Sequence, residues 1–487
     1  MEINPAVTFK HDRTVMYSKR PKVLIIGAGL GGLALAMLLN KTDIPYEIFE
    51  RAAEVKPLGS AISLTASTSS LFKQMGLWDE LHALSREMCV IQVMNEDLEL
   101  QFTVATVDDP AKRYGSTIRI IPRPTLYDLL LRQVPKDRIH FGKKILSTQQ
   151  GGNGVLVRCS DGTEYDGDIL VGADGAYSAV RQNLYTQLKK DKKLPPADSE
   201  PLPFSTVCLV GQTRPLTIEE FPHLAREKSQ FVRVLGTDKP YAWTTFTTQA
   251  STVTFSVIQF LDEESSKEND AFRQSEWGVE GADAMCKEVR DFPVVSGNEK
   301  NLTIGDLIDL TPKHLISKVM LEEKVFKTWY HCRTVLLGDA CHKLNPSGGA
   351  GATNSFHDAI VLANYIYALP DHPIAQEIED CFKAYYEERI PWVEAAFTTS
   401  QTFRNMVAKG FKARMTRSMM KYMPNWLQLV FEKRLLSYRP QVSFLPPDDT
   451  KAEMEAAPQP SLHVRRPKAA EKKKDIPVAL EDVVEPI

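Results

Sequence analysis

Three glycines in a six-residue run could bring a nucleotide close to the backbone. Gly27, Gly29 and Gly32 form a G-x-G-x-x-G pattern directly after the β-branched run 23–26, and an apolar helical segment follows. In such a turn the first glycine permits the bend, the second lets the backbone approach a pyrophosphate, and the third lets the helix pack on the strand. The pattern predicts a dinucleotide site at a helix N-terminus.

An acidic residue follows this turn at the spacing of a ribose-binding carboxylate. Residues 46–49 predict a second strand, which ends at Glu50 and Arg51. Glu50 can accept hydrogen bonds from a ribose diol and would repel the 2′-phosphate of NADP, so FAD or NAD is the predicted tightly held nucleotide. A membrane-spanning helix over 23–39 is the alternative, and four glycines within six residues disfavour it.

Further polar residues stand where predicted strands end. Arg123 lies between the strand 117–121 and a helix, where its guanidinium could reach a phosphate or form a local salt bridge. Asp174 follows the strand 167–171 and could bind a ligand hydroxyl or cap the next helix. Ser63 belongs to a small-residue segment that could lie against a flat ligand or form an ordinary turn.

A second glycine-rich turn occurs far along the chain. Asp339 follows the buried strand 334–337, and the glycine-rich run 348–351 precedes a helix. Amide groups at the start of that helix, around Gly351 and Ala352, suit an anionic or carbonyl-bearing ligand. The sequence thus predicts a nucleotide site that is closed by a distant return segment.

Composition limits the remaining classes of function. The 487 residues, of which 43% are hydrophobic and 25% charged, suffice for two or three globular domains, and the net charge of -3 gives no general attraction to nucleic acid. Seven scattered cysteines without a C-x-x-C pair indicate reduced thiols, and no H-E-x-x-H occurs, so no metal site is predicted. Residues 1–22 contain no apolar signal-peptide core, and a cytoplasmic location is expected.

Four motifs, in this order, resemble those of the single-component (class A) FAD-dependent monooxygenases. This is the family of para-hydroxybenzoate hydroxylase and of the fungal FAD-dependent epoxidases and hydroxylases. The resemblance spans about 20–400. It rests on the first glycine-rich turn with Glu50 and Arg51, on RPTLYDLL from Arg123, on GADGAYSAVR at 172–181, and on GDACHKLNPSGGAGATNSFHDA at 338–359.

The resemblance implies a role for each matching residue. Glu50 would hold the adenosine ribose, Ser63 would line the FAD cleft, and Arg123 would contact the phosphate or ribityl region. Asp339 would bind the ribityl chain or pyrophosphate, and Asp174 would serve both FAD and the incoming nicotinamide nucleotide. The implied cofactor-binding set is Gly27, Gly29, Gly32, Glu50, Arg51, Ser63, Arg123, Asp174, Asp339, Gly351 and Ala352. His342 occupies a family position, and we interpret it as structural.

The resemblance also implies a fold class and a division into domains. The expected architecture is α/β, with a Rossmann-type FAD-binding domain of the para-hydroxybenzoate hydroxylase kind, an interleaved antiparallel-sheet substrate domain and a C-terminal helical extension. The expected segments are the first part of the FAD-binding domain at 20–200, the β-sheet substrate domain at 201–325, the FAD-domain return segment at 326–400, a basic helical extension at 401–446, and a disordered tail at 447–487.

The activity implied by the resemblance is oxygen insertion. FAD would be reduced by transient NADPH or NADH, O2 would form a C4a-hydroperoxyflavin, and its distal oxygen would hydroxylate an aromatic or epoxidise an alkene in a small organic substrate. No catalytic side chain is assigned. The alternatives are a flavin-dependent dehydrogenase or reductase on the same fold and a non-catalytic binding protein of the prenyl-protein escort kind.

The segment 401–436 allows two interpretations. It contains eight basic residues and one acidic residue, and its apolar residues recur at roughly helical spacing. A basic amphipathic helix can lie on an anionic membrane surface as a peripheral contact. Alternatively, the helix packs against the FAD domain and exposes a basic face.

Overall fold

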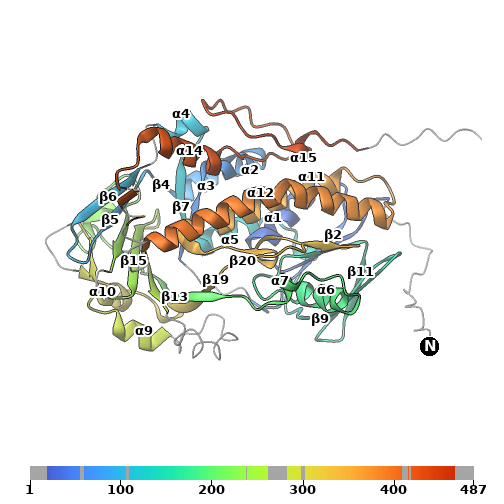
Figure 1. The fold of residues 1–487 in the computed structure, drawn as a ribbon, viewed down its shortest axis with the longest axis horizontal. Coiled ribbons are helices and arrows are strands. Elements are labelled where there is room, and N and C mark those ends of the chain that lie inside the picture. Colours follow the sequence, from blue (N-terminus) through green and yellow to red (C-terminus); the bar gives the residue numbers. More distant parts are fainter. Residues whose placement is uncertain are drawn as a thin grey trace, which may run out of the picture.

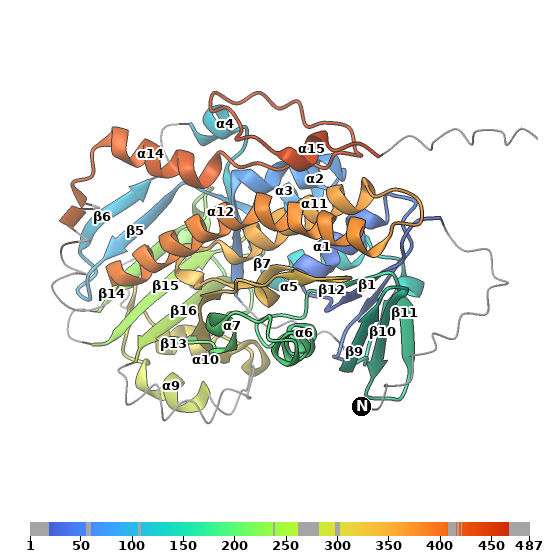
Figure 2. The ribbon, with the colours of Figure 1, turned by 45° about the vertical axis from the view of Figure 1, so that its right-hand side comes forward.

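The computed structural model describes residues 19–54, 60–105, 109–236, 239–261, 282–297, 302–407, 415, 418–419 and 421–466. Two large sheets lie at opposite ends of the molecule, and one long helix runs across both of them (Figures 1 and 2). The architecture is α/β, as the sequence predicts.

A six-stranded, mainly parallel sheet forms the first half. Its central strand β1 (Val23–Ile26) pairs in parallel with β2 (Tyr46–Phe49) and β12 (Ile169–Gly172). The order is β21-β22-β12-β1-β2-β8, with only β21 antiparallel among these strands. The outer strands are β22 (Thr334–Leu336), β21 (Tyr330–His331) and β8 (Ile139–His140). The strand β22, far along the chain, therefore belongs to the same sheet as β1.

Two helices of this half are almost completely buried, α1 because its sequence is apolar on all sides and α11 although it carries polar residues, several of which are hydrogen-bonded inside the protein. In α1 (Leu30–Leu39) every residue from Gly32 to Leu39 is buried, and in α11 (Gly351–Tyr367) every residue from Thr353 to Ile366 is buried. A helix without a polar face needs protein on all sides. These two helices pack against each other over the sheet, so the two glycine-rich turns that begin them lie at one end of one helix pair.

Smaller elements complete this half. A three-stranded sheet borders the parallel sheet, and a second one, in the order β3-β7-β4, lies toward the other half. These strands are β9 (Ile145–Gly151), β10 (Gly154–Cys159), β11 (Glu164–Gly167), β3 (Ala61–Leu64), β7 (Ile118–Pro122) and β4 (Arg86–Met88). The accompanying helices are α2 (Ser69–Gln74), α3 (Trp78–Leu84), α4 (Pro110–Tyr114), α5 (Arg123–Leu131), α6 (Ala179–Lys190) and α7 (Pro196–Ser199).

A seven-stranded sheet, in the order β19-β13-β16-β15-β14-β5-β6, forms the second half. Every neighbouring pair is antiparallel except β14 and β5. Its strands are β13 (Phe204–Gln212), β14 (Phe231–Leu235), β15 (Tyr241–Thr247), β16 (Val253–Phe260), β19 (Ser317–Glu322), β5 (Val90–Met94) and β6 (Leu100–Ala105). Short elements around it are α9 (Asp283–Glu288), α10 (Ile304–Asp309), β17 (Pro293–Val294) and β18 (Leu302–Thr303). The strands β20 (Lys324–Val325) and β23 (His342–Lys343) pair with each other next to α12 and the turn at 338–340.

The sheet differs from the sequence prediction at its edge. The sequence places residues 90–105 in the first part of the FAD-binding domain, whereas β5 and β6 extend the seven-stranded sheet. The chain reaches this sheet early, pairs β5 in parallel with β14, and then returns to the first half at β7. Pairing between strands so far apart in the chain leaves no local pattern in the sequence.

The C-terminal part begins with α12 (Ala375–Val407), a 33-residue helix with Pro391 inside it, and continues with α14 (Asn425–Leu436). Residues 437–466 then run back over the first half and include α15 (Pro460–His463). The prediction of a disordered tail at 447–487 is wrong for 447–466, which packs on the FAD-binding half through Asp448 and Ser461. Residues 467–487 lie outside the described residues.

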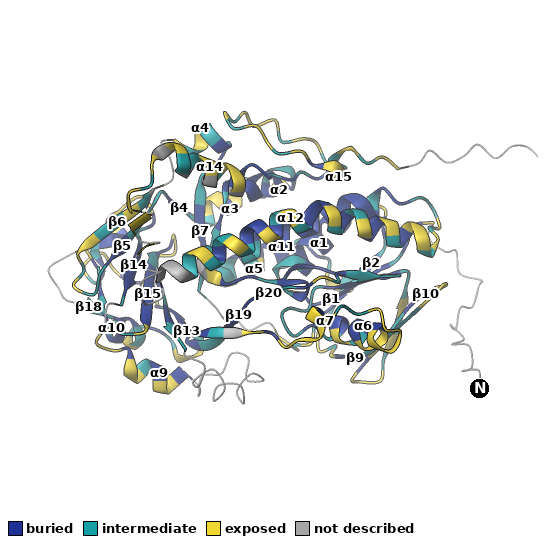
Figure 3. Cartoon of the chain, in the orientation of Figure 1, coloured by how far each residue is buried: buried dark blue, intermediate teal, exposed yellow. Residues whose placement is uncertain are grey.

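Burial separates the first part of α12 from the described residues between 415 and 430 (Figure 3). Ile378, Phe382 and Tyr385 of α12 are fully buried, whereas an apolar stripe of five side chains beyond it is between 48% and 73% exposed. We define the apolar stripe as Met415, Met419, Tyr422, Trp426 and Val430. None of the helices within the described residues combines the length and the hydropathy that a bilayer-spanning segment requires.

Candidate active site

A cavity of about 900 Å³ lies between the two halves. On one side it is lined by the turn after β1, the start of α5, the motif after β12 and the start of α11. On the other side it is lined by one face of the seven-stranded sheet. We call these two sides the nucleotide wall and the sheet wall.

The three glycines of the first turn have different geometries. Gly27 has a φ of +102°, and a Cβ there would stand 2.4 Å from the Ala173 carbonyl oxygen. A Cβ on Gly32 would stand 2.0 Å from the Gly27 carbonyl oxygen. A Cβ on Gly29 would meet no atom within 4 Å, and Gly29 lines the cavity. Gly27 and Gly32 are thus required by the fold, whereas Gly29 keeps open the space where a ligand would approach the N-terminus of α1.

Glu50 contacts the backbone of the same turn. The Ala28 N–H donates to its Oε2 at 3.0 Å, and the Ala52 N–H donates to its Oε1 at 2.9 Å. Each carboxylate oxygen keeps acceptor capacity beyond these bonds. Glu50 is not a cavity-lining residue, but Arg51 and Ser63 are. Its role at a ribose stays a prediction.

Arg123 and Asp339 face the cavity together. Arg123 is the first residue of α5, and its N–H donates to the Ser60 carbonyl at 3.0 Å. Burial lowers the pKa of the Arg123 guanidinium, and the nearby Asp339 carboxylate opposes that shift. Asp339 also accepts from Lys343 Nζ at 2.5 Å. This part of the nucleotide wall therefore combines two cations, Arg123 and Lys343, with the carboxylate of Asp339, which matches a ligand that carries both phosphate and hydroxyl groups.

Asp174 performs the capping role that the sequence offered as the alternative. Its Oδ2 accepts from the Ala179 N–H at 2.7 Å and from the Val180 N–H at 3.2 Å, and its Oδ1 accepts from Ser178 Oγ at 2.5 Å. Burial nevertheless raises the pKa of this carboxyl. Asp174 also lines the cavity, so contact with a bound cofactor stays a prediction.

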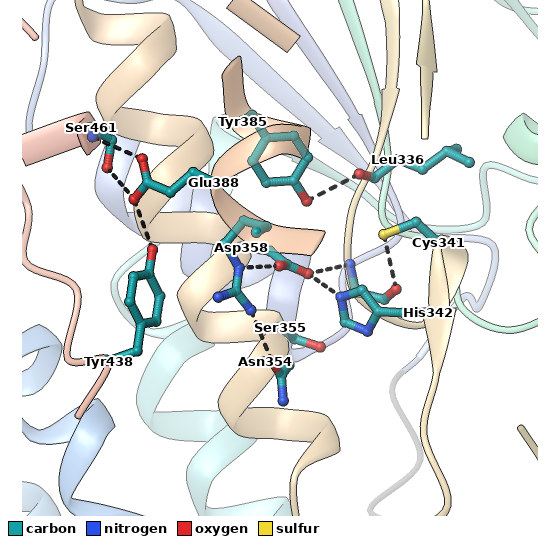
Figure 4. Close-up of polar contacts among 12 residues, drawn as sticks. Leu336, Cys341, His342, Asn354, Ser355, Asp358, Tyr385, Glu388, Tyr438 and Ser461 are labelled. Carbon is teal, nitrogen blue, oxygen red and sulfur yellow. Dashed lines mark hydrogen bonds and ion pairs between the residues drawn. The ribbon is translucent and has the colours of Figure 1, made fainter. Parts of the chain in front are cut away.

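A buried charged network holds the start of α11 (Figure 4). Asp358 Oδ2 accepts from the Gly338 N–H at 3.0 Å and lies 2.5 Å from His342 Nε2, while its Oδ1 accepts from Arg389 Nε at 2.8 Å. Burial raises the pKa of Asp358, but His342 and Arg389 together outweigh burial and lower this pKa to about 2. The network joins the Asp339 turn, α11 and α12, and it agrees with our structural interpretation of His342. Gly351 and Ala352, at the start of α11, line the cavity.

A second buried carboxylate, Glu388, holds the returning C-terminal segment (Figure 4). Its Oε1 accepts from Tyr438 OH at 2.8 Å and from Ser461 Oγ at 3.0 Å. Its Oε2 accepts from Tyr365 OH at 3.0 Å and from the Ser461 N–H at 2.8 Å. Residues 437–466 are therefore fixed to α11 and α12 behind the nucleotide wall.

The sheet wall contains side chains that the sequence did not single out. It is mostly apolar, but a polar row crosses it where Arg233 of β14 pairs with Thr244 of β15 and Thr244 pairs with Ser256 of β16. We define the sheet wall by six of its residues, Val210, Phe231, Arg233, Thr244, Phe246 and Ser256. In the sequence, Arg233 is recognisable as a charged residue within the strand-like run FVRVL, but this pattern does not show that it faces a cavity.

Glu322 is a further missed residue, at the end of β19 between the two walls. It lines the cavity, is 3% exposed, and accepts a hydrogen bond from Tyr177 OH. Burial and the nearby Asp339 carboxylate raise the pKa of Glu322 to about 7, although Lys343 opposes the shift. The cavity therefore contains a carboxyl group that changes charge near neutral pH.

Comparison with protein families defines the class. The model of the FAD binding domain family matches residues 20–400, and the chain belongs to that family. The open space at Gly29, the cationic nucleotide wall and the two helix N-termini fit FAD, which is bound by this family. The family match and the names of its relatives identify the chain as an FAD-dependent monooxygenase.

Several relatives match along most of their length. The chain is 30% identical over 356 residues to the aurachin C monooxygenase/isomerase of Stigmatella aurantiaca, covering 72% of this chain and 82% of the relative. It is 27% identical over 391 residues to the FAD-dependent monooxygenase ptmM of Penicillium ochrochloron, covering 78% and 87%. The predicted family resemblance is confirmed.

Solved structures show the same fold. Klebsiella pneumoniae HpxO, determined with FAD and uric acid, matches with a TM-score of 0.66 at 18% identity and covers 85% of this chain and 97% of that one. The 2,6-dihydroxypyridine-3-hydroxylase of Arthrobacter nicotinovorans matches with a TM-score of 0.58 at 16% identity, covering 80% and 94%. At these identities the likeness supports the fold alone.

Proposed function

We propose that the protein uses NADPH or NADH and O2 to insert one oxygen atom into a small organic substrate, by hydroxylating an aromatic or epoxidising an alkene. The observation that carries this proposal is a cavity in which the nucleotide wall faces a mostly apolar sheet wall. Such a cavity holds a flavin and a lipophilic substrate side by side and away from water.

In this proposal, the chain's own residues bind FAD and the substrate, orient them toward each other and shield them from water. When bound, FAD supplies the acceptance of hydride and the activation of O2. Gly29 would let the pyrophosphate approach the N-terminus of α1, and Arg123 would contact a phosphate. Amides at Gly351 and Ala352 would point at the flavin pyrimidine and stabilise negative charge that develops there. The sheet wall would hold the substrate against the opposite side.

NAD(P)H would visit this cavity transiently. In the described residues, one glycine-rich turn combines a preceding parallel strand, a buried helix and a following acid, and that turn is assigned to FAD. A second dinucleotide therefore has no strand-turn-helix site of its own there. Asp174, which lines the cavity on the nucleotide wall, is the residue that would serve both nucleotides.

Oxidation of NADPH and of NADH in air by the purified holoprotein tests the proposal. The assay follows flavin absorbance and products with a panel of phenols, prenylated aromatics and alkenes. Substrate-stimulated oxidation with an oxygenated product is expected. Reducible FAD with no oxygenated product would favour a dehydrogenase or reductase. A protein that takes up no FAD would favour a binding protein of the prenyl-protein escort kind.

We further propose a cytoplasmic location with peripheral contact to an anionic membrane surface through 401–436. The apolar stripe is exposed on the elements that follow α12, and Lys421, Lys433 and Arg434 are exposed near it. Apolar side chains flanked by cations suit an anionic lipid interface. Met419 and Met423 also line the cavity, which would give a lipophilic substrate a short path from the membrane.

Flotation with vesicles tests this contact. The full chain is expected to float with vesicles that contain phosphatidylserine and to remain behind with neutral phosphatidylcholine vesicles. Trp426→Asp should abolish flotation, whereas Ile218→Asp, on an exposed residue of the substrate domain, should leave it unchanged. Equal flotation of both variants would contradict the proposal.

A further inference from the structure

Three side chains of the kinds that ligate metals meet at the edge of the parallel sheet. His331 ends the edge strand β21, Cys332 follows it in the turn to β22, and Glu379 belongs to α12. One potential ligand atom of each residue lies within 4.8 Å of the others. The three residues are not among those that line the cavity. We call them the hairpin cluster.

The imidazole of His331 lies between the other two groups. Its Nδ1 is 3.4 Å from Glu379 Oε1, and its Nε2 is 3.6 Å from Cys332 Sγ. A histidine that directs one ring nitrogen at a carboxylate presents the lone pair of the other, which is the usual arrangement of a histidine metal ligand. With bond lengths of about 2.3 Å to sulfur and about 2.0 Å to nitrogen, tetrahedral zinc holds these two ligands about 3.6 Å apart. The separation of Sγ and Nε2 therefore already suits a shared ion.

Glu379 is held in place and keeps one oxygen for a ligand. Its Oε1 accepts from the Cys332 N–H at 3.0 Å, whereas none of the described residues donates to its Oε2. The side chains of His331 and Glu379 are 19% and 31% exposed, so an ion can reach them from solvent. The carboxylate supplies one negative charge, and the thiol supplies a second when a metal displaces its proton.

The neighbouring cations do not occupy this place. Lys193 and Arg333 are the basic groups whose charge acts on the Cys332 thiol. The guanidinium of Arg333 donates to the backbone carbonyl groups of residues 151, 152 and 168, and Lys193 is exposed. In the part of the chain that the structure describes, neither forms an ion pair with Glu379. The two negative charges that the cluster can offer are thus available to a divalent cation.

A second cluster of similar side chains shows the contrasting case. Cys341, His342 and Asp358 also bring ligand atoms within 4.8 Å of one another, but all three are buried. The Asp358 carboxylate already pairs with His342 and with the cation Arg389. A protein cation therefore takes the place that a metal ion would need there, whereas the hairpin cluster is open to solvent.

We propose that His331 Nε2, Cys332 Sγ and a carboxylate oxygen of Glu379 bind one Zn²⁺ ion, with water as the fourth ligand. Thiolate and imidazole favour zinc over magnesium or calcium. No motif of fixed spacing marks the site, since 47 residues separate Cys332 from Glu379. The ion would join the β21–β22 hairpin to α12 and thereby brace β22, which leads to the turn that carries Asp339. This inference concerns a site outside the cavity and does not depend on the proposed function.

Metal binding to the untagged, FAD-loaded full chain tests the assignment. Competition with a chromophoric chelator should give one Zn²⁺ per chain, with a Kd at or below about 1 μM. The melting temperature should rise by a few degrees with Zn²⁺ and should not change with Mg²⁺. Co²⁺ in the same site should give the ligand-field bands of a tetrahedral thiolate complex, at wavelengths longer than those that oxidised flavin absorbs.

Variants of the ligands identify the site. Cys332→Ser and His331→Gln should each weaken Zn²⁺ binding by at least about tenfold, and Cys332→Ser should remove the cobalt–thiolate bands. The control is Cys286→Ser, which removes another half-buried thiol and should keep both signals. Absence of Zn²⁺ binding at 10-fold the expected Kd, or binding that is unchanged in Cys332→Ser, would overturn the proposal.

A glycine variant separates the ligand from the turn. Cys332 has a φ of +50°, in the left-handed region that glycine adopts without strain. Without metal, Cys332→Gly should therefore melt at or above the temperature of the wild type, and Zn²⁺ should not raise that temperature. If Zn²⁺ stabilises Cys332→Gly as much as the wild type, the thiol is not a ligand and the assignment is wrong. Oxygen transfer is not measured in any of these experiments, so the proposed function stands or falls separately.

Discussion

The two walls of the cavity differ in whether backbone groups or side chains form their surface. The nucleotide wall consists mainly of turns, helix N-termini and backbone amides, and a few charged side chains fix those turns from behind. The sheet wall consists of alternate side chains on regular strands. Backbone-built surfaces tolerate few residues at each position, whereas side chains on a sheet can be exchanged without altering the strands. Substitutions should therefore affect cofactor retention on one wall and substrate choice on the other.

The largest expected effect is at the first glycine-rich turn. Gly32→Ala would place a methyl group 2.0 Å from the Gly27 carbonyl oxygen, so it should abolish FAD binding and lower the melting temperature. Gly29→Val should abolish FAD binding while the melting temperature of the FAD-free protein is unchanged, because its Cβ meets only open space. Flavin absorbance per protein and thermal unfolding measure both effects.

The control for this prediction is Gly152→Ala, where a Cβ meets nothing within 4 Å and φ is not positive. It should retain both FAD and stability. If Gly32→Ala binds FAD like the control, the close packing of this turn is not what fixes the nucleotide wall.

The next effect concerns the charged network behind α11. Asp358→Asn would leave Arg389 buried without its counter-charge and should cost about 3–5 kcal/mol of unfolding free energy. Because the pKa of Asp358 is lowered to about 2, its contribution should be complete above the unfolded value of 3.8 and lost as the pH falls through about 2. Denaturant unfolding at several pH values measures it. Asp309→Asn, in an exposed pair with Arg290, should cost less than about 1 kcal/mol.

A smaller and different effect is expected on the sheet wall. Phe246→Ala removes one ring of the aromatic pair that Phe246 forms with Phe231 and should raise KM for the preferred substrate by about tenfold while FAD content is unchanged. Steady-state kinetics and flavin absorbance separate the two effects. Ile218→Ala, an exposed residue of the same half, should change neither. Loss of FAD in Phe246→Ala would contradict the separation of the two walls.

The smallest effect concerns Glu322, where the walls meet. Its pKa is raised from 4.5 to about 7, so the folded state favours the protonated carboxyl, and stability should fall as the pH rises from about 4.5 to about 7. Glu322→Gln should therefore gain about 1–2 kcal/mol over the wild type at pH 8, after allowance for solvent screening, and little at pH 4.5. Unfolding at both pH values tests this, with the exposed Glu164→Gln as control. A gain that is independent of pH would contradict it.

The same contrast explains what the sequence could reveal. The nucleotide wall was predictable because each of its turns needs glycine or a charged residue at a fixed position after a strand. Eight of the predicted cofactor-binding residues line the cavity, and Gly27, Gly32 and Glu50 support the turn directly behind it. Their individual roles toward FAD stay predictions.

The sheet wall was not predictable, since one residue of register decides whether a side chain faces the cavity or the core. Arg233 stands in FVRVL, which identifies a strand but not its cavity-facing side. The C-terminal segment was misjudged for another reason. Its proline-rich, aromatic-free composition indicates disorder, but Ser461 donates hydrogen bonds to the buried Glu388. Because Glu388 lies elsewhere in the chain, the sequence of the segment alone does not show that it is held in this way.

The attachment of Ser461 to Glu388 has a consequence for biosynthesis. The nucleotide wall begins at Gly27, yet the residues that brace it from behind include one of the last described residues of the chain. At about 5–20 residues per second, a ribosome needs about 20–90 s to translate from the first to the last. During synthesis, the nucleotide wall should therefore lack this bracing contact until Ser461 has emerged from the ribosome.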